Sequence, residues 1–238
     1  MELSLRMKQV ADMVEPCHTV ADIGCDHGYV SIYLIEQEVA QQVIAMDVRT
    51  GPLSRAKENV RQKQLQDRIQ CRLSDGLEGL AIGEADTIVI AGMGGPLMIS
   101  ILEQGKKKRL GTETLVLQPQ SDIPEVRRYL HRTGYCIVQE QMLWEEGKYY
   151  TILKAKVQET DQWDAVEYKY GKWLLEQMSP VLYQYLIKEQ CQLTELTMKL
   201  QQQQTDKARK RFEELKVQLE WNQEAQKRYE IKNNHELA

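Results

Sequence analysis

Strand-like and helix-like segments alternate along the first two thirds of this 238-residue chain. Short runs rich in β-branched residues predict five strands, at Thr19–Ile23, Gln42–Asp47, Ile69–Leu73, Ala85–Ala91 and Glu113–Gln118. Helical patterns are predicted at Tyr29–Glu38, Pro52–Gln64, Leu97–Gln104 and Ile123–Thr133, with a short or irregular stretch near Leu77–Leu80. This alternation predicts right-handed crossovers and a mostly parallel sheet, which is an α/β fold.

Two further strands, Tyr135–Met142 and Tyr149–Lys156, are predicted to complete the sheet. Only Leu143–Lys148 separates them, which is too short for a parallel crossover, so they should form an antiparallel hairpin. Five parallel strands followed by such a hairpin resemble the Rossmann-like class I methyltransferase fold, with its mostly parallel seven-stranded sheet, more than a dehydrogenase fold.

The composition of the chain changes near residue 157. Thirteen of the 14 glycines precede it, so a turn-rich region gives way to a helical one, and we expect two domains, residues 1–157 and 158–238. In the second domain, Ser179-Pro180 is a typical helix start, and two apolar series are out of register across residues 201–206. An antiparallel helical hairpin resembling a short coiled coil is the simpler interpretation, and one continuous helix with a stutter is the alternative.

Composition also excludes several classes of protein. With 42% hydrophobic and 28% charged residues, the chain is not mostly disordered. The five cysteines show neither C-x-x-C pairs nor metal-ligand spacing, so we expect no metal, no disulfide framework and a reducing cytoplasm. The N-terminus lacks a signal-peptide pattern, and the longest uncharged stretch, residues 87–102, is shorter than the roughly 20 residues that span a bilayer. No membrane protein is expected.

The segment Asp22–Tyr29 follows the first strand and opens a helix, which is the position of a cofactor loop. Gly24 permits a tight turn and a close backbone approach. Asp26 stands where a pyrophosphate would need bare backbone, and a carboxylate there repels a diphosphate. The carboxylates of Asp22 and Asp26 instead suit a cationic amine, such as the methionine end of S-adenosylmethionine. The alternative is a purely structural strand–turn–helix.

Acids also follow the second and third strands. Asp47 could accept hydrogen bonds from both hydroxyls of a ribose, Asp75 could accept from an adenine amino group, and Gly76 would keep the adjacent wall low. Because ligands of open α/β sheets bind at the carboxyl ends of strands, three successive acidic strand ends predict one nucleoside-shaped pocket. Individually, Asp47 could instead cap a helix, and Asp75-Gly76 could form an ordinary turn.

The fourth strand ends in Ile90-Ala-Gly-Met-Gly-Gly-Pro96. Many amino methyltransferases have Asn or Asp followed by Pro-Pro-Tyr at this place, where the acidic or amide side chain holds the target amine. The glycines found here leave backbone groups exposed, so that a flat substrate can approach closely. A tight turn into the next helix is the structural alternative.

The chain resembles the bacterial tRNA (adenine-22-N1)-methyltransferase family in Asp22-Ile-Gly-x-Asp-His-x-Tyr29, Gly51-Pro52, Asp75-Gly76-Leu77, Ile90-Ala-Gly-Met-Gly-Gly95 and Leu117-Gln-Pro119. The resemblance covers essentially the whole chain, although the C-terminal part matches only in architecture. It implies a class I fold, S-adenosylmethionine as the methyl donor, and N1 of an adenosine in the D-arm region of tRNA as the acceptor. The residues assigned to the cofactor are Asp22, Gly24, Asp26, Asp47, Asp75, Gly76 and Ala91.

The absence of an Asp or Asn side chain at the end of the fourth strand agrees with methylation of adenine N1. This nitrogen has a lone pair and attacks the methyl group without first losing a proton. Alignment and exclusion of water could therefore supply most of the acceleration. Our hypothesis places Tyr29 and His27 in the target-base pocket, Tyr29 by stacking and His27 by hydrogen bonding or phosphate contact. Backbone acceptors at Gly92, Met93 and Gly94 would favour charge developing on the ring. Helix packing for Tyr29 and a first-turn cap for His27 are the alternatives.

A net charge of −4 mildly opposes tRNA binding, but the basic residues are clustered. Residues 49–72 carry seven basic and two acidic side chains, Arg127 and Arg128 follow the fifth strand, and Arg6 precedes the first. Several of these should lie at the carboxyl edge of the sheet, so reversing Arg127 and Arg128 should weaken tRNA binding. Lys106–Arg109 is expected on the opposite edge. The helical hairpin could clamp tRNA or mediate dimerisation, so we expect a monomer or a weak homodimer.

Three other functions fit parts of the sequence. A methyltransferase acting on a small molecule or protein could use the helical pair as a lid or dimer element. A non-catalytic nucleoside- or RNA-binding module is disfavoured by the intact acids at positions 22, 47 and 75, and an NAD-dependent dehydrogenase is disfavoured by Asp26.

Overall fold

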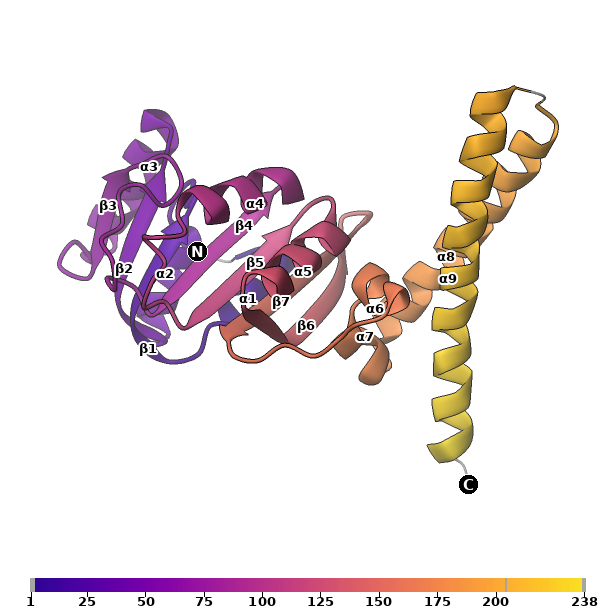
Figure 1. Cartoon of the computed structure of the whole chain (residues 1–238). Coiled ribbons are helices and arrows are strands. Elements are labelled where there is room, and N and C mark those ends of the chain that lie inside the picture. Colours follow the sequence, from indigo (N-terminus) through magenta and orange to yellow (C-terminus); the bar gives the residue numbers. More distant parts are fainter. Residues whose placement is uncertain (1–2, 204, 237–238) are drawn as a thin grey trace. The chain divides into compact units, whose positions relative to one another are not determined.

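The chain divides into two compact units, Met1–Asp161 and Gln162–Ala238. A computed structural model describes residues 3–203 and 205–236, with side chains described as far as Ile231. The first unit contains one β-sheet with helices on both faces, and the second unit is helical (Figure 1).

The sheet of the first unit has seven strands, in the spatial order β3-β2-β1-β4-β5-β7-β6. They are β1 (Cys17–Ile23), β2 (Ala40–Asp47), β3 (Ile69–Leu73), β4 (Thr87–Met93), β5 (Thr114–Pro119), β6 (Tyr135–Glu145) and β7 (Lys148–Val157). Strands β1 to β5 pair in parallel, and β7 is antiparallel to both of its neighbours. The predicted fold class is therefore confirmed. Strand order reverses between β1 and β4, which is where open α/β sheets bind ligands.

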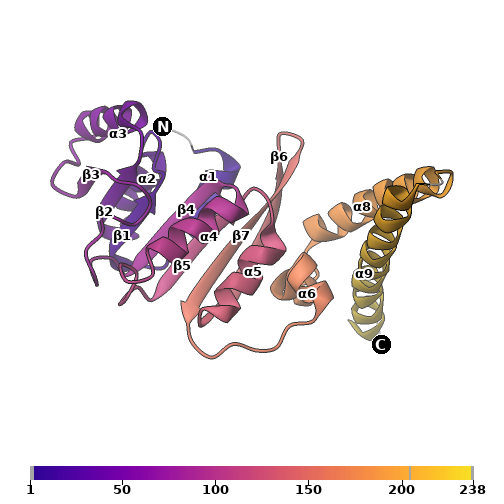
Figure 2. The same ribbon diagram turned by 45° about the horizontal axis from the view of Figure 1, so that its top comes forward.

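Five helices belong to this unit: α1 (Leu5–Asp12), α2 (Tyr29–Glu36), α3 (Thr50–Gln62), α4 (Gly95–Gln104) and α5 (Ile123–Arg132). Helices α4 and α5 cover one face of the sheet, and α1 and α2 lie on the other (Figures 1 and 2). The last four were predicted with slightly different ends, whereas residues 77–80 form turns and no helix. Helix α1 was not predicted. Ser4 caps it by accepting from the Met7 amide, and Val10 and Ala11 bury it against the sheet.

The central strands are buried on both faces, which explains their continuous apolar sequence. The side chains of Ile88, Val89 and Ile90 in β4 are fully buried, as are those of Leu115 to Leu117 in β5. Because this core is rigid, the loops at the carboxyl ends of the strands are held at fixed distances from one another.

The second unit consists of two short helices, α6 (Ala165–Tyr170) and α7 (Lys172–Glu176), and two long ones, α8 (Pro180–Gln201) and α9 (Asp206–Glu236). Ser179 caps α8 by accepting from the Leu182 amide, as its sequence predicts. The break between α8 and α9 falls within the predicted residues 201–206, so the helical hairpin is confirmed and the continuous helix is excluded. The two long helices run antiparallel (Figures 1 and 2). Helices α6 and α7 were not predicted.

A buried polar network joins the two long helices. Glu189 of α8 accepts hydrogen bonds from the hydroxyls of Tyr170 (2.7 Å) and Tyr185 (2.8 Å) and from the amide of Asn222 (3.0 Å). Asn222 is fully buried and also donates to the Leu186 carbonyl at 3.0 Å. Burial raises the pKa of Tyr170, and the Glu189 carboxylate raises it further, so the phenol remains a donor. A buried network of this kind fixes the register of the hairpin.

Replacing Asn222 by Ala should destabilise the full chain by about 1–3 kcal/mol, because Glu189 and the Leu186 carbonyl each lose a buried hydrogen-bond donor. Thermal unfolding followed by circular dichroism measures the loss, and amide exchange locates it in α8 and α9. Glu195→Ala, which breaks an exposed pair with Lys199, is the control and should leave stability almost unchanged. Equal stability of Asn222→Ala and the wild type would contradict a register-fixing network.

Candidate active site

A pocket of about 460 Å³ lies at the carboxyl ends of β1 to β4. Eight of the twelve predicted site residues line it, namely Gly24, Asp26, Asp47, Asp75, Gly76, Ala91, Gly92 and Met93. The loops after four separate strands therefore meet in one place, at the reversal of strand order. The sequence analysis had not assigned several further wall residues to this site, among them Arg6, Met7, Val48, Arg49, Leu97 and Gln120.

The carboxylate of Asp47 connects two of these loops. Asp47 ends β2 and is 3% exposed. One oxygen accepts from the Asp26 amide at 3.2 Å, and the other accepts from the Arg49 amide at 2.8 Å. An ionised carboxylate has about four lone-pair sites, so acceptor capacity remains on the side that faces the pocket. This geometry suits a diol such as a ribose.

The turn after β1 requires glycine at its first position. Gly24 has φ +74°, and its amide and that of Cys25 both donate to the Met46 carbonyl, at 2.8 and 2.9 Å. A Cβ atom on Gly24 would collide with the terminal methyl of Met93. The Met93 side chain at the end of β4 thus packs directly over the loop that follows β1, and this close packing brings the two walls of the pocket together.

The third loop contributes Asp75 and Gly76. Ser74 holds the loop, since its amide donates to the Asp47 carbonyl oxygen at 3.0 Å and its hydroxyl accepts from the Gly79 amide at 2.8 Å. Asp75 is exposed at the rim of the pocket. Gly76 has φ +51°, and a Cβ atom there would lie 3.0 Å from Ile101, so glycine keeps this wall low.

The wall after β4 is shaped by a bulge. The pairing of β4 with β5 shifts between Ala91 and Met93, and Gly92 has φ +79°. The Gly92 amide donates to the side-chain oxygen of Gln118 at 3.2 Å, and Arg6 donates to the same oxygen at 2.8 Å. Gln118 is fully buried. A polar residue within the apolar strand Leu115–Pro119 was the sequence signal that could have revealed it.

Asp22 does not line the pocket. It is 5% exposed, and one of its oxygens accepts from the Ser31 hydroxyl at 2.6 Å. Burial, together with the nearby charge of Asp47, raises the pKa of Asp22 to about 6, although the hydrogen bonds from Ser31 act in the opposite direction. Asp22 therefore lies beneath the cofactor loop, where it ties β1 to α2.

The other three predicted residues also lie outside the wall of the pocket. The rings of His27 and Tyr29 stack with centroids 5.4 Å apart, and Tyr29 borders a separate small depression together with Asn59. The Asn59 side chain donates to the His27 carbonyl at 2.9 Å. Gly94 precedes α4, and its carbonyl accepts from the Met98 amide at 3.0 Å. Because this bond engages the Gly94 carbonyl, Gly94 is less available to a substrate than Gly92 is.

The expectation that Arg127 contacts tRNA is wrong, because its side chain is buried. Arg127 is 1% exposed and its Nε donates to the buried carboxylate of Glu140 at 2.8 Å. Arg109 is also buried, against the ring of Tyr135. Helix α5 therefore directs one arginine into the protein, whereas Arg128 is only partly buried.

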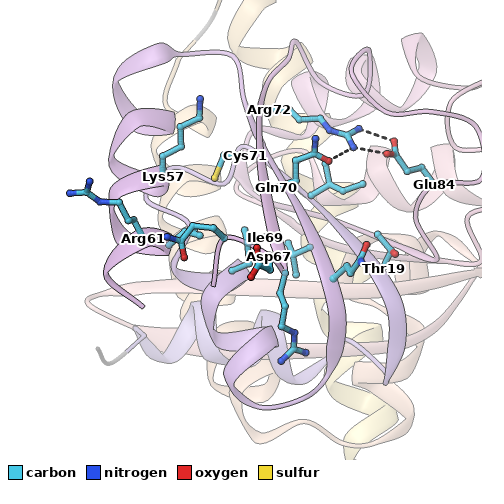
Figure 3. Close-up of a pocket in the computed structure, with 15 residues that line it drawn as sticks. Thr19, Lys57, Arg61, Asp67, Ile69, Gln70, Cys71, Arg72 and Glu84 are labelled. Atoms are coloured by element: carbon cyan, nitrogen blue, oxygen red, sulfur yellow. Dashed lines mark hydrogen bonds and ion pairs between the residues drawn. The ribbon is translucent and has the colours of Figure 1, made fainter. Parts of the chain in front are cut away.

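A second and larger pocket, of about 630 Å³, borders the edge strand β3. Lys57 and Arg61 of α3 line one side of it, and Arg72 bonds to Glu84 at 2.8 Å on the other (Figure 3). None of the motifs that carry the family resemblance contributes to this pocket. The smaller pocket, where four strand ends converge, is therefore the candidate active site.

Within residues 3–203 and 205–236, no group of three or more His, Cys, Asp or Glu side chains is arranged to hold a metal ion. In the same part of the chain, no helix has both the length and the apolar character needed to cross a membrane.

Residues 3–153 match the protein family described as methyltransferase domain. The tRNA (adenine(22)-N(1))-methyltransferase of Bacillus subtilis is 40% identical over 161 residues, which is 68% of each chain. The crystal structure of the B. subtilis m1A22 tRNA methyltransferase TrmK superposes with a TM-score of 0.86 at 32% identity, covering 94% of this chain and 98% of that one. Streptococcus pneumoniae Sp1610 in complex with S-adenosyl-L-methionine gives 0.83 at 32% identity, covering 94% and 99%.

The sheet order and the pocket at its reversal point define a Rossmann-like methyltransferase. The similarity to named tRNA (adenine-22-N1)-methyltransferases identifies the family within this class. The chain belongs to the tRNA (adenine-22-N1)-methyltransferase family, which confirms the resemblance found in its motifs.

Stability should fall as the pH rises from about 4 to about 6, because Asp22 holds a proton in the folded state that the unfolded chain has already released. The stabilisation is fully present below about pH 4 and is lost above about pH 6, a change on the order of 2–3 kcal/mol. Urea unfolding at several pH values measures it. Asp22→Asn should remove this component, and Asp67→Asn, an exposed control, should retain it. Parallel curves for the wild type and Asp22→Asn would contradict the assignment.

Replacing Arg127 by Met should destabilise the chain by roughly 3–5 kcal/mol, because it leaves the Glu140 carboxylate buried without its cation. Denaturant unfolding measures this loss. Arg128→Met, one position along the same helix, is the matched control and should have little effect. If Arg127→Met were as stable as Arg128→Met, the buried pair would not support the fold.

Proposed function

We propose that this chain transfers the methyl group of S-adenosylmethionine to N1 of an adenosine in tRNA, at position 22 in the D-arm region. One observation carries the proposal: acids after β2 and β3 and a glycine bulge after β4 line opposite sides of one pocket. The acidic side suits a cationic nucleoside, and the bulge offers no carboxylate or carboxamide of its own to hold a target amine. The named specificity of the relatives supports the same acceptor.

The residues of the pocket fit this cofactor. Asp47 is preoriented by two backbone amides to receive the ribose hydroxyls. Asp75, at the rim, would accept from the adenine amino group, while Gly76 leaves room for the ring beside Ile101. Gly24 and Asp26 would receive the methionine end, with the carboxylate near its ammonium group. Asp22 lies beneath the loop that follows β1 and would act as a positioning residue for that loop.

The reaction needs no general base in its bond-forming step. The cofactor supplies a sulfonium methyl group, which is electrophilic. The lone pair of adenine N1 forms the new bond to the methyl carbon as the carbon–sulfur bond breaks, and the sulfur keeps that electron pair. The product is a cationic N1-methyladenosine, which can release an N6 proton afterwards. Gly92 and Met93 would align the ring and exclude water, which is the main catalytic contribution expected of them.

The stacked pair of His27 and Tyr29 lies beside the cofactor loop. We propose that it contacts the tRNA next to the target base, since Tyr29 is 37% exposed and offers a ring face for stacking. His27→Ala should then raise KM for tRNA; an unchanged KM and an unchanged turnover at saturating tRNA would remove His27 from the proposed site.

The division of labour between the two domains is also a proposal. We infer that residues 1–157 carry catalysis and that the helical domain, residues 158–238, contacts tRNA or a second copy of the chain. A cytoplasmic location follows if tRNA is the substrate.

Incubation of tRNA transcripts with labelled cofactor, followed by nucleoside analysis, tests the proposed reaction. A transcript with adenosine at position 22 should gain 1-methyladenosine, and the same transcript with guanosine there should not. Thermal shift should show stabilisation by S-adenosylmethionine and none by NAD. Methylation of a different nucleoside, or none at all, would reject the assignment.

Asp47→Asn should weaken cofactor binding roughly 10- to 100-fold, because a charged acceptor of hydrogen bonds becomes neutral and one of its oxygens becomes a donor. Calorimetric titration with S-adenosylhomocysteine measures the affinity, and circular dichroism confirms folding. Asp67→Asn, an exposed acid remote from this pocket, should bind normally. Wild-type affinity in Asp47→Asn would exclude the ribose contact.

A further inference from the structure

The guanidinium group of Arg6 is held inside the active-site pocket by a neutral partner. Arg6 comes from α1 and lines the pocket. Its Nη1 donates to the side-chain oxygen of Gln118 at 2.8 Å, and its guanidinium lies 5.2 Å from the centre of the Tyr150 ring. Its backbone amide donates to Glu145 at 3.3 Å, which anchors the start of α1 to the end of β6. Three separate elements thus fix the position of this arginine.

No described carboxylate neutralises the charge of Arg6. The partners of its guanidinium are an amide oxygen and an aromatic face, both uncharged. Arg127 differs, because its guanidinium pairs with the Glu140 carboxylate. A positive charge that is fixed, partly desolvated and uncompensated attracts an anion. The pocket therefore contains a prepared site for a negatively charged oxygen.

This cation lies on the acceptor side of the pocket. A Cβ atom built on Gly92 would be 3.7 Å from Arg6 Nη1 and 3.8 Å from Gln120 Nε2, so both nitrogen groups converge over this glycine. The acids Asp47 and Asp75 belong instead to the loops after β2 and β3. A nucleotide whose base reaches Gly92 brings a phosphate with it, and guanidinium geometry matches phosphate oxygens.

Gln118 links this cation to the bulge. Its buried oxygen accepts from both Arg6 and the Gly92 amide, and its Nε2 donates to the Pro119 carbonyl at 3.0 Å. All the polar atoms of this side chain are thus engaged, so its orientation is determined. A glutamate could make the same two acceptor bonds, but it would neutralise Arg6. An amide positions the guanidinium and preserves its charge.

We propose that Arg6 binds a phosphate of the tRNA beside the target adenosine, and that Gln118 is a positioning residue which holds both Arg6 and the Gly92 backbone in place. This inference rests on the proposed function, because it assigns the acceptor side of the same pocket. It adds an RNA contact from α1, a helix that precedes the cofactor loop.

The variants Arg6→Met and Gln118→Glu separate charge from shape. Arg6→Met removes the cation, whereas Gln118→Glu retains an acceptor oxygen and cancels the charge. Each should weaken tRNA binding roughly tenfold at low salt and lower the slope of log affinity against log salt by about one. The double variant should bind tRNA more weakly than either single variant, because it removes the cation and leaves an unpaired carboxylate on the acceptor side of the pocket.

Three measurements are made on each folded full-length variant: tRNA affinity at several salt concentrations, S-adenosylhomocysteine affinity by calorimetry, and single-turnover methylation. Cofactor affinity should stay unchanged. Lys156→Met is the matched control, since it removes a cation paired with Glu15 near the amino-terminal end of β5. Its salt slope should equal that of the wild type.

Other outcomes overturn the inference. Weaker cofactor binding by Arg6→Met with an unchanged salt slope would assign the cation to the cofactor carboxylate. Unchanged slopes in both variants with normal cofactor binding would leave Arg6 and Gln118 with structural roles only. A wild-type chain that neither binds nor methylates tRNA would reject the proposed function itself, and this failure is visible without any variant.

Discussion

The active site depends on one buried carboxylate. Asp47 accepts from the amides of Asp26 and Arg49, so a single side chain joins the loop after β1 to the loop after β2. Hydrogen bonds to an ionised acceptor are stronger than neutral ones, and burial keeps water from competing for them. Because the same carboxylate lines the pocket, the proposed ribose contact would couple cofactor affinity to loop geometry. A change that weakens this group also loosens the turn that contains Gly24.

Most of the fold could be predicted because its signals are periodic and local. The alternation of strands and helices and the short connection before β7 were sufficient for the sheet, and Ser179-Pro180 marked the start of α8. Helix α1 has a local signal in its Ser4 cap, but it is only eight residues long and buries Val10 and Ala11 against strands that are distant in sequence. The stretch near Leu77–Leu80, predicted to be short or irregular, forms turns, and the amide of Gly79 bonds to Ser74 there.

The sequence predicted which residue types form the candidate site better than it predicted which of their side chains are buried. Glycines and acids at the ends of successive strands identified the pocket, but Asp22 is buried outside its lining, where its carboxylate accepts from the Ser31 hydroxyl of α2. The prediction that Arg127 contacts tRNA failed for a related reason. Its partner Glu140 lies on another element, and no local sequence pattern indicates a buried ion pair. The pairing of Arg6 with Gln118 needed the three-dimensional structure, since the two residues are 112 positions apart in the sequence.

The two walls of the pocket differ in charge, and this difference suits the movement of charge in the reaction. In the proposed reaction, the sulfonium cation would start beside the loops that carry Asp26 and Asp47, and the positive charge would end on the adenine ring next to Gly92. A full negative charge on the acceptor wall would hold the cationic product tightly and slow its release. Backbone dipoles stabilise developing charge without binding the product as an ion pair. Gln118 organises the bulge without adding a charge of its own, and the phosphate proposed to bind Arg6 would neutralise the cation on this wall.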